Sequence, residues 1–209
     1  MIRILMADDH PSIRKGVKLI LADEFSELDF EEAATTGEVL KKARNKKWDV
    51  LILDVDMPGR NGFEALKQLK EENPGVRVLM FSMHPEGQVA VRALKSGAYG
   101  YLAKDTAGEE LINAVRLIMN GKKYITPSIA EMLVSYVENP VDKAPHEHLS
   151  DREYQTLLLI GSGKTVSEIA KELSLSIPTI STYRARILEK MAMKTNAELV
   201  SYAVRNGLV

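Results

Sequence analysis

The chain has 209 residues, of which 45% are hydrophobic and 27% charged, and its formal net charge is −1. This length suffices for two modest domains, and the composition is ordinary for a soluble globular protein. The absence of cysteine excludes a disulfide framework and any thiolate metal site. No apolar run reaches the roughly 18 residues of a membrane helix, and no signal-peptide pattern opens the chain, so we expect a cytoplasmic protein with no membrane partner.

Residues 1–122 alternate strand-like and helix-like segments. The pattern predicts strands at about 2–7, 28–34, 49–54, 76–81 and 99–103, and helices at about 12–22, 37–46, 62–72, 86–97 and 107–120. Five βα units with mostly apolar strands predict an α/β fold, in which helices cover both faces of a parallel sheet. The basic run at 41–47 is expected to be the solvated end of a helix, where cations suit the helix dipole.

Charged and polar residues stand at the ends of these predicted strands. Asp8 and Asp9 end the first strand, and Asp54 ends the third. Carboxyl ends of parallel strands share one edge of the sheet, where open α/β folds bind ligands, so these carboxylates should gather in one pocket. Clustered carboxylates repel one another unless a cation lies among them, and their hard oxygens suit Mg²⁺. With Ser82 and Lys104 at the ends of the last two strands, the sequence predicts a site for a divalent metal and a phosphoryl group.

A change of composition separates two parts of the chain. A short amphipathic helix is expected at 124–137, and residues 138–145 carry prolines among polar residues, which is typical of a linker. The predicted domains are therefore 1–122 and 148–209, joined by a helix and linker at 123–147. His146 and His148 have no third metal ligand nearby, so we expect both to be exposed to solvent.

The last part of the chain is expected to contain helices alone, at about 151–161, 166–173, 177–192 and 196–206. Capping boxes of the form S/T-x-x-E mark three helix starts. These pairs are Ser150/Glu153, Thr165/Glu168 and Thr195/Glu198. A further helix starts at Ser176, with Pro178 in its first turn. The short join between the second and third helices is compatible with a helix-turn-helix.

The third of these helices has two unlike faces. A buried stripe is predicted at Ile180, Tyr183, Ile187, Leu188 and Met191, which recur at helical spacing. On the other face, small side chains would let the helix approach base edges, and flanking cations would meet phosphates. The predicted DNA-facing residues are Thr179, Ser181, Thr182, Arg184, Ala185, Arg186 and Lys190. The ordinary alternative is the solvated face of a helical bundle.

The strand-end motifs resemble the receiver domain of two-component response regulators. They are Asp-Asp-His-Pro at 8–11, Asp-Val-Asp-Met-Pro-Gly at 54–59, Phe-Ser at 81–82 and Gly-Tyr-Leu-Ala-Lys-Asp at 100–105. The resemblance implies a flavodoxin-like, doubly wound sheet of five parallel strands in the order 2-1-3-4-5. It implies that Asp54 accepts a phosphoryl group from a phosphohistidine on a sensor histidine kinase. It also implies that Mg²⁺ is held by Asp9, Asp54 and the backbone carbonyl of Asp56, with Asp8 acting through water.

The same resemblance gives roles to residues at the later strand ends. Lys104 would neutralise charge on the phosphoryl oxygens together with the metal. Ser82 would hydrogen-bond the attached group, and Tyr101 would then turn inward, changing the surface around the fifth strand. Asp56 and His84 occupy positions that tune the lifetime of the acyl phosphate in this family. A solvated loop histidine is an equal alternative for His84.

Residues 149–153, 161–170, 173–180 and 205–209 resemble the LuxR-type helix-turn-helix, and the two halves together resemble a NarL/FixJ-type response regulator. This implies that the helix at 177–192 enters the major groove and that the final helix forms a dimer contact. Ser181 and Tyr183 stand where the family often has Lys and His, so the target sequence cannot be taken from relatives. We therefore expect a regulator of transcription, not an enzyme, that binds a double-stranded DNA operator as a homodimer when phosphorylated.

Two other classes of protein compete with this interpretation. A phosphatase of the haloacid-dehalogenase type also uses an Asp nucleophile and Mg²⁺, but it needs D-x-D-x-T/V after the first strand. Asp54 and Asp56 have the required spacing, yet they follow the third strand and no cap insertion accompanies them. A scaffold that is switched by protein binding alone is the third reading. Steady turnover of a phosphate ester would favour the phosphatase, and failure to bind any DNA would favour the scaffold.

Overall fold

The computed structural model describes residues 1–57, 61–106, 108–138 and 144–209. The chain divides into two compact units, Met1–Ile129 and Ala130–Val209. This division falls inside the helix and linker predicted at 123–147. Within the described ranges, none of the helices has the length and apolar character needed to span a bilayer.

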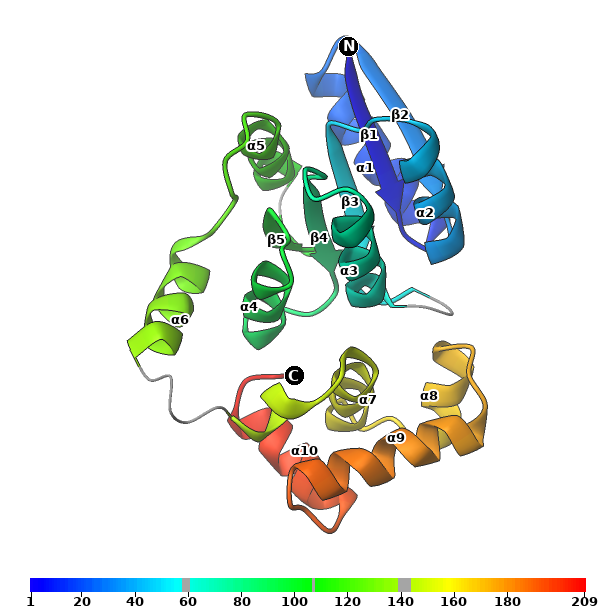
Figure 1. Ribbon diagram of the computed structural model, residues 1–209, viewed down its shortest axis with the longest axis vertical. Coiled ribbons are helices and arrows are strands. Elements are labelled where there is room, and N and C mark those ends of the chain that lie inside the picture. The colour runs from blue at the N-terminus through cyan, green and yellow to red at the C-terminus, as the bar shows by residue number, and fades with distance from the viewer. Residues whose placement is uncertain (58–60, 107, 139–143) are drawn as a thin grey trace. The chain divides into compact units, whose positions relative to one another are not determined.

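The first unit is built on a parallel sheet of five strands in the order β2-β1-β3-β4-β5 (Figure 1). The strands are β1 (Ile2–Ala7), β2 (Leu28–Ala33), β3 (Val50–Asp54), β4 (Val78–Ser82) and β5 (Gly100–Ala103). The predicted strand order is therefore confirmed. Because β1 lies between β2 and β3, the direction of winding reverses there, and a ligand crevice is expected at the carboxyl ends of these strands.

Helices cover both faces of this sheet (Figure 1). They are α1 (Pro11–Glu24), α2 (Thr36–Asn45), α3 (Gly62–Glu72), α4 (Gln88–Lys95) and α5 (Gly108–Met119). Leu21 of α1 and Val115 of α5 belong to one buried cluster with Ile52 of the sheet. Leu51 and Met80 point to the opposite face because side chains alternate along a strand, and they are equally buried. Burial on both faces explains why the central strands β3 and β4 are almost entirely apolar, whereas the half-buried edge strand β2 carries three acidic residues.

The second unit is helical. After α6 (Pro127–Glu138), it contains a 3₁₀ turn (Pro145–His148), α7 (Asp151–Gly161), α8 (Val166–Glu172), α9 (Ile177–Lys190) and α10 (Asn196–Arg205). The capping boxes predicted at Ser150 and Thr165 are present, and Ser176 caps α9. Thr195 caps α10, but the carboxylate of Glu198 accepts the N–H of Lys194, one residue before the cap. Local capping chemistry thus sets the helix starts of this unit.

The predicted exposure of His146 is wrong. Its side chain is buried, and its Nδ1 lies 2.7 Å from the hydroxyl of Tyr202 on α10. The imidazole also lies close to two tyrosine rings, with centroid distances of 6.0 Å to Tyr154 and 5.8 Å to Tyr202. Tyr202 lies 56 residues further along the chain, so the composition of the linker does not predict this contact. His148 is exposed, as expected.

Candidate functional site

Three strand ends bring two carboxylates and one ammonium together at the carboxyl edge of the sheet. Asp8 follows β1, Asp54 ends β3, and Lys104 follows β5. The Nζ of Lys104 lies 2.7 Å from Asp8 Oδ2 and 2.8 Å from Asp54 Oδ2, and at most 2% of each of the three side chains is exposed. The structure therefore gathers these residues in one buried cluster, as the strand pattern predicts.

Two neighbours extend this cluster toward the surface. Asp8, Asp9, His10 and Asp54 each offer a ligand atom, and these atoms lie within 4.8 Å of one another. His10, which the motif analysis leaves without a role, places its Nδ1 2.7 Å from Asp9 Oδ1. Carboxylate oxygens dominate the set, and a hard divalent cation such as Mg²⁺ fits such donors.

The charges in this cluster have opposing effects on Asp54. Burial, supported by the Asp8 and Asp56 carboxylates, raises the pKa of Asp54 to about 7, although Lys104 works to lower it. Burial works to lower the pKa of Lys104, but Asp54 and Asp8 outweigh burial and raise this pKa above its usual value. Lys104 therefore keeps its proton, and Asp54 is a carboxylate whose charge is only partly compensated.

A close backbone contact fixes the chain that carries Asp54. The N–H of Gly62, at the start of α3, donates to the carbonyl of Val55 at 2.9 Å. A Cβ at Gly62 would lie 2.1 Å from the carbonyl oxygen of Asp54, so no larger residue fits there. Gly62 belongs to none of the sequence motifs, although close approach of two backbone segments is one of the reasons for which a position requires glycine. Pro58 and Gly59 of the predicted motif lie outside the described residues.

Ser82 and Tyr101, the two residues expected to respond to phosphorylation, both form hydrogen bonds with the loop after β4. Ser82 is buried, and its Oγ accepts the N–H of His84 at 3.2 Å. Tyr101 is also buried, in the inward position, and its hydroxyl donates to the carbonyl of His84 at 2.7 Å. The Nε2 of His84 lies 3.0 Å from Asp56 Oδ2, so His84 is not a solvated loop residue. His84 thus connects this loop to the loop that follows Asp54.

In the second unit, α9 has one buried and one exposed face. Ile180, Ile187 and Met191 are buried, and Tyr183 and Leu188 are half-buried, which confirms the predicted stripe. The opposite face is exposed at Ser181, Thr182, Ala185 and Arg186. Thr179 is half-buried at the helix start, where its Oγ1 lies 2.7 Å from Ser176 Oγ. The exposed face therefore combines small side chains with a guanidinium.

Two other cations predicted to face DNA have partners within the unit. Arg184 donates from Nε to Asn196 Oδ1 at the start of α10. Lys190 Nζ lies 2.6 Å from Oε2 of Glu153, a carboxylate that is only 3% exposed. Burial works to raise the pKa of Glu153, but Lys190 and the hydrogen bonds from Ser150 outweigh it and hold this pKa below its usual value. Both cations thus contribute to holding α9 against its neighbours.

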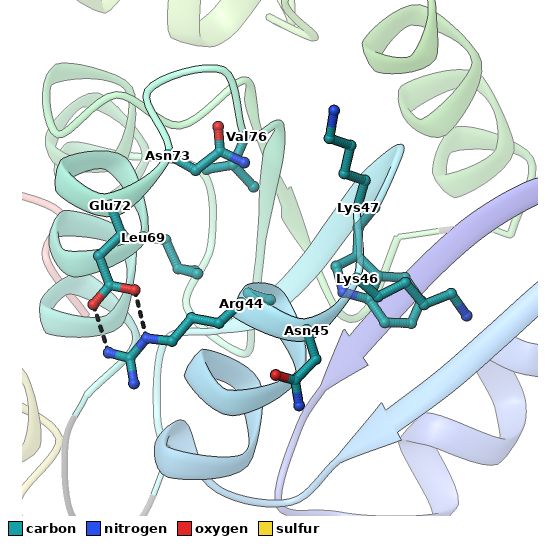
Figure 2. A pocket seen from close by; sticks show the side chains of 10 residues that line it. Arg44, Asn45, Lys46, Lys47, Leu69, Glu72, Asn73 and Val76 are labelled. Atoms are coloured by element: carbon teal, nitrogen blue, oxygen red, sulfur yellow. Dashed lines mark hydrogen bonds and ion pairs between the residues drawn. The ribbon is translucent and has the colours of Figure 1, made fainter.

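A separate hollow of about 510 Å³ lies at the carboxyl-terminal ends of α2 and α3 (Figure 2). The guanidinium of Arg44 binds the carboxylate of Glu72 through two nitrogens. Lys46 Nζ lies 3.1 Å from Glu31 Oε1 and 4.4 Å from the centre of the Trp48 ring.

The basic run at 41–47 includes the carboxyl-terminal end of α2, as expected, and Lys41, Arg44 and Lys47 are exposed. Several of its cations also bind acids of the same unit. Arg44 and Lys46, two of the cations that line this hollow, are therefore already paired with carboxylates.

Comparisons with known proteins agree with this architecture. Residues 4–116 match the response regulator receiver domain, and residues 147–203 match the bacterial regulatory proteins of the luxR family. The chain belongs to the family of two-component response regulators that carry a receiver domain and a LuxR-type DNA-binding domain. The predicted family, fold class and role in regulating transcription are thereby confirmed, and a receiver domain implies a kinase partner.

The relatives match over the full length of the chain. Response regulator GacA of Pseudomonas viridiflava is 39% identical in an alignment of 210 positions that covers 100% of this chain and 98% of GacA. Response regulator UvrY of Escherichia coli (strain K12) is 34% identical over 209 residues, covering 100% of this chain and 96% of UvrY. Among solved structures, an RcsB–DNA complex has a TM-score of 0.60 at 25% identity, covering 97% of this chain and 98% of that one.

Proposed function

We propose that Asp54 accepts a phosphoryl group from a phosphohistidine of a sensor histidine kinase, and that phosphorylation controls binding to a DNA operator. The observation that carries this proposal is the contact of Lys104 Nζ with both Asp8 and Asp54 in a buried pocket at the sheet edge. Such a pocket offers one carboxylate as nucleophile and one fixed cation beside it. Its Asp54 acceptor would be modified once per cycle, which is the behaviour of a switch and not of an enzyme.

In the proposed transfer, a carboxylate oxygen of Asp54 attacks the phosphorus atom. The P–O bond of an acyl phosphate forms, the P–N bond breaks, and the imidazole of the donor leaves with the bonding electron pair. Lys104 neutralises negative charge on the phosphoryl oxygens, and the hydroxyl of Ser82 donates a hydrogen bond to one of them. Acceleration then comes from positioning and from fixed charges, as in other phosphoryl transfers.

The oxygen-rich pocket fits Mg²⁺ as the resident cation. Asp9, Asp54 and the backbone carbonyl of Asp56 would hold the ion, and Asp8 would act through water. When bound, the ion supplies positive charge to the clustered carboxylates and to the phosphoryl oxygens. His10 beside Asp9 would help to orient that carboxylate.

For the second unit, we assign the exposed face of α9 to the major groove. Ser181, Thr182 and Ala185 would face base edges, and Arg186 would bind phosphate. Thr179, Arg184 and Lys190 would support these contacts by holding the helix. A homodimer formed through α10 would present two copies of α9 to half-sites roughly one helical turn apart. Because DNA is the target, we place the protein in the bacterial cytoplasm.

Labelling with acetyl phosphate tests the acceptor. Asp54→Asn should abolish labelling, whereas Asp56→Asn should still be labelled and should change the lifetime of the acyl phosphate, because Asp56 lies beside the site of water attack. Stoichiometric labelling of Asp54→Asn would mean another acceptor. Equal decay rates for Asp56→Asn and the wild type would contradict the role of Asp56.

Selection from a random-sequence duplex library, with and without acetyl phosphate, tests the output. Phosphorylated wild-type protein should bind the selected duplex more tightly than untreated protein, and Asp54→Asn should show no such difference. Steady release of phosphate from a phosphate ester would instead indicate a phosphatase. Failure to retain any duplex would indicate a scaffold.

A further inference from the structure

One large apolar side chain is exposed at the start of α9. Ile177, the first residue of this helix, is 52% exposed, whereas Ile180 and Ile187 of the same helix are fully buried. Apolar side chains that are exposed singly are common on protein surfaces, so exposure alone gives Ile177 no role. Its position on the helix and the groups around it are more informative.

Ile177 lies on the same row of the helix surface as two residues assigned to base edges. Ser181 and Ala185 follow it at intervals of four residues, a spacing that puts side chains on one face of a helix. Helical side chains also point toward the amino-terminal end, so Ile177 extends this row beyond Ser181. In a helix-turn-helix, the amino-terminal residues of the second helix contact base edges. With α9 in the major groove as proposed, Ile177 would therefore reach a base.

The polar groups around Ile177 are bonded within the helix. Ser176 Oγ accepts the N–H of Thr179 at 3.2 Å and lies 2.7 Å from Thr179 Oγ1. The hydroxyl of Thr182 donates to the carbonyl of Pro178 at 2.9 Å. Pro178 itself has no N–H to donate. The first turn of α9 therefore presents mainly carbon to a partner, namely the branched side chain of Ile177 and the exposed ring of Pro178.

Thymine offers the chemistry that matches such a surface. Its 5-methyl group is the distinctive apolar group in the major groove, and apolar side chains contact it there. The other groups along the base edges are mostly hydrogen-bond donors and acceptors, which isoleucine would leave unpaired on displacing their water. Isoleucine is also β-branched and stiff at χ1, so it loses little rotamer freedom when it packs against a base.

We infer that Ile177 reads a thymine in each half-site of the operator through the 5-methyl group of that base. This inference rests on the proposed binding of α9 in the major groove, and it names one determinant of the target sequence. Burying one carbon group of this size changes an affinity about fourfold. The contact should therefore be measurable at a single base pair.

Replacing thymine by uracil tests the contact, because the two bases differ only by the 5-methyl group. The probe is the duplex selected by phosphorylated wild-type protein, in which uracil replaces each thymine in turn. For wild type, one such replacement in a half-site should lower the affinity about fourfold. Ile177→Ala should bind the thymine and uracil forms equally at that position. Because the ratio is taken within one protein, a general loss of affinity in the variant cancels.

Three further variants serve as controls. Val134→Ala, at a position of α6 that is 55% exposed, is matched for the truncation of an exposed apolar side chain and should keep every wild-type ratio. Arg186→Ala should weaken binding to all the duplexes and leave the ratios unchanged, because its side chain would bind phosphate. Ile177→Val keeps the branch at Cβ and should give a ratio between those of wild type and Ile177→Ala.

The outcomes distinguish this inference from the proposed function. A selected duplex in which no replacement lowers the wild-type affinity would overturn the inference and leave DNA binding intact. Losses that are equally large in Ile177→Ala at every thymine would show that other side chains contact these methyl groups, and would also overturn it. Failure of wild-type protein to retain any duplex would overturn the proposed function itself, and this inference with it.

Discussion

Replacing Lys104 by Met removes the positive charge between two buried carboxylates, and we expect it to destabilise the first unit when no divalent cation is present. The ammonium lies 2.7 Å from Asp8 and 2.8 Å from Asp54, and its side chain is 2% exposed. Removing one partner of a buried ion pair costs about 3–5 kcal/mol. We therefore expect a loss of about 3 kcal/mol at about pH 8 in the presence of a chelator.

Protonation of Asp54 should reduce this loss at lower pH. The pKa of Asp54 in the folded protein, about 7, is above its usual value, and because Lys104 works to lower it, this pKa should be higher still in the variant. As the pH falls toward 7, the folded variant therefore takes up a proton that the wild type does not yet bind. A protonated Asp54 carries no negative charge for Lys104 to neutralise. The difference in unfolding free energy between variant and wild type should therefore shrink by up to about 1.4 kcal/mol per pH unit. Added Mg²⁺ should reduce it as well, because the ion supplies positive charge to the same carboxylates.

Fluorescence can follow the first unit alone, because the chain has one tryptophan, Trp48, which precedes β3. A urea titration of the full chain in chelator, read at this residue, gives the change in unfolding free energy. Lys104→Arg keeps the charge and should lose less, and Lys122→Met, at an exposed position, should match wild type. If Lys104→Met unfolded at the same urea concentration as wild type at about pH 8, the expected cost of removing this charge would be refuted.

Three further changes test other parts of the chain. Gly62→Ala would place a Cβ 2.1 Å from the Asp54 carbonyl, so labelling should slow and stability should fall, whereas Gly37→Ala, with nothing within 4 Å, should change neither. The loss of stability, read by urea titration, should be about 1–3 kcal/mol. Glu153→Gln should destabilise the second unit by about 1–2 kcal/mol at neutral pH. Because the pKa of Glu153 is lowered on folding, its contribution is present above the ordinary value of 4.5 and is lost as the pH falls through the folded value, so melting curves of both proteins should converge in acid. Arg186→Ala should weaken binding to all duplexes and lower the slope of log affinity against log salt by about 0.9, and a loss confined to one sequence would contradict a phosphate contact.

The sheet and the position of its pocket could be predicted from the sequence because both follow from local patterns. Apolar runs that end on Asp8, Asp54 and Lys104 define the strands, and the geometry of a parallel sheet brings their ends together. The cap residues of the second unit define its helices in the same local way. Residue type and spacing therefore suffice where neighbours along the chain determine the structure.

Contacts between distant segments could not be predicted in this way. His146 lies in a stretch of linker composition, yet it is buried because Tyr202 lies 56 residues further along and meets its ring. The helical position of Lys190 predicts a contact with DNA, but it does not reveal the ion pair that its ammonium forms with Glu153 on another helix. Glu86 and Thr126, whose side chains form a hydrogen bond of 2.5 Å, belong to no sequence motif. Each of these cases depends on which helices or loops become neighbours after folding.

The strand ends that form the pocket also constrain how the protein is made. Asp8 leaves the ribosome early, but Lys104 follows it only after four more strands have been synthesised. A growing chain that lacks β5 has the carboxylates of the pocket without the ammonium of Lys104. Under the proposed function, the pocket would therefore become able to accept a phosphoryl group only when the last strand joins the sheet.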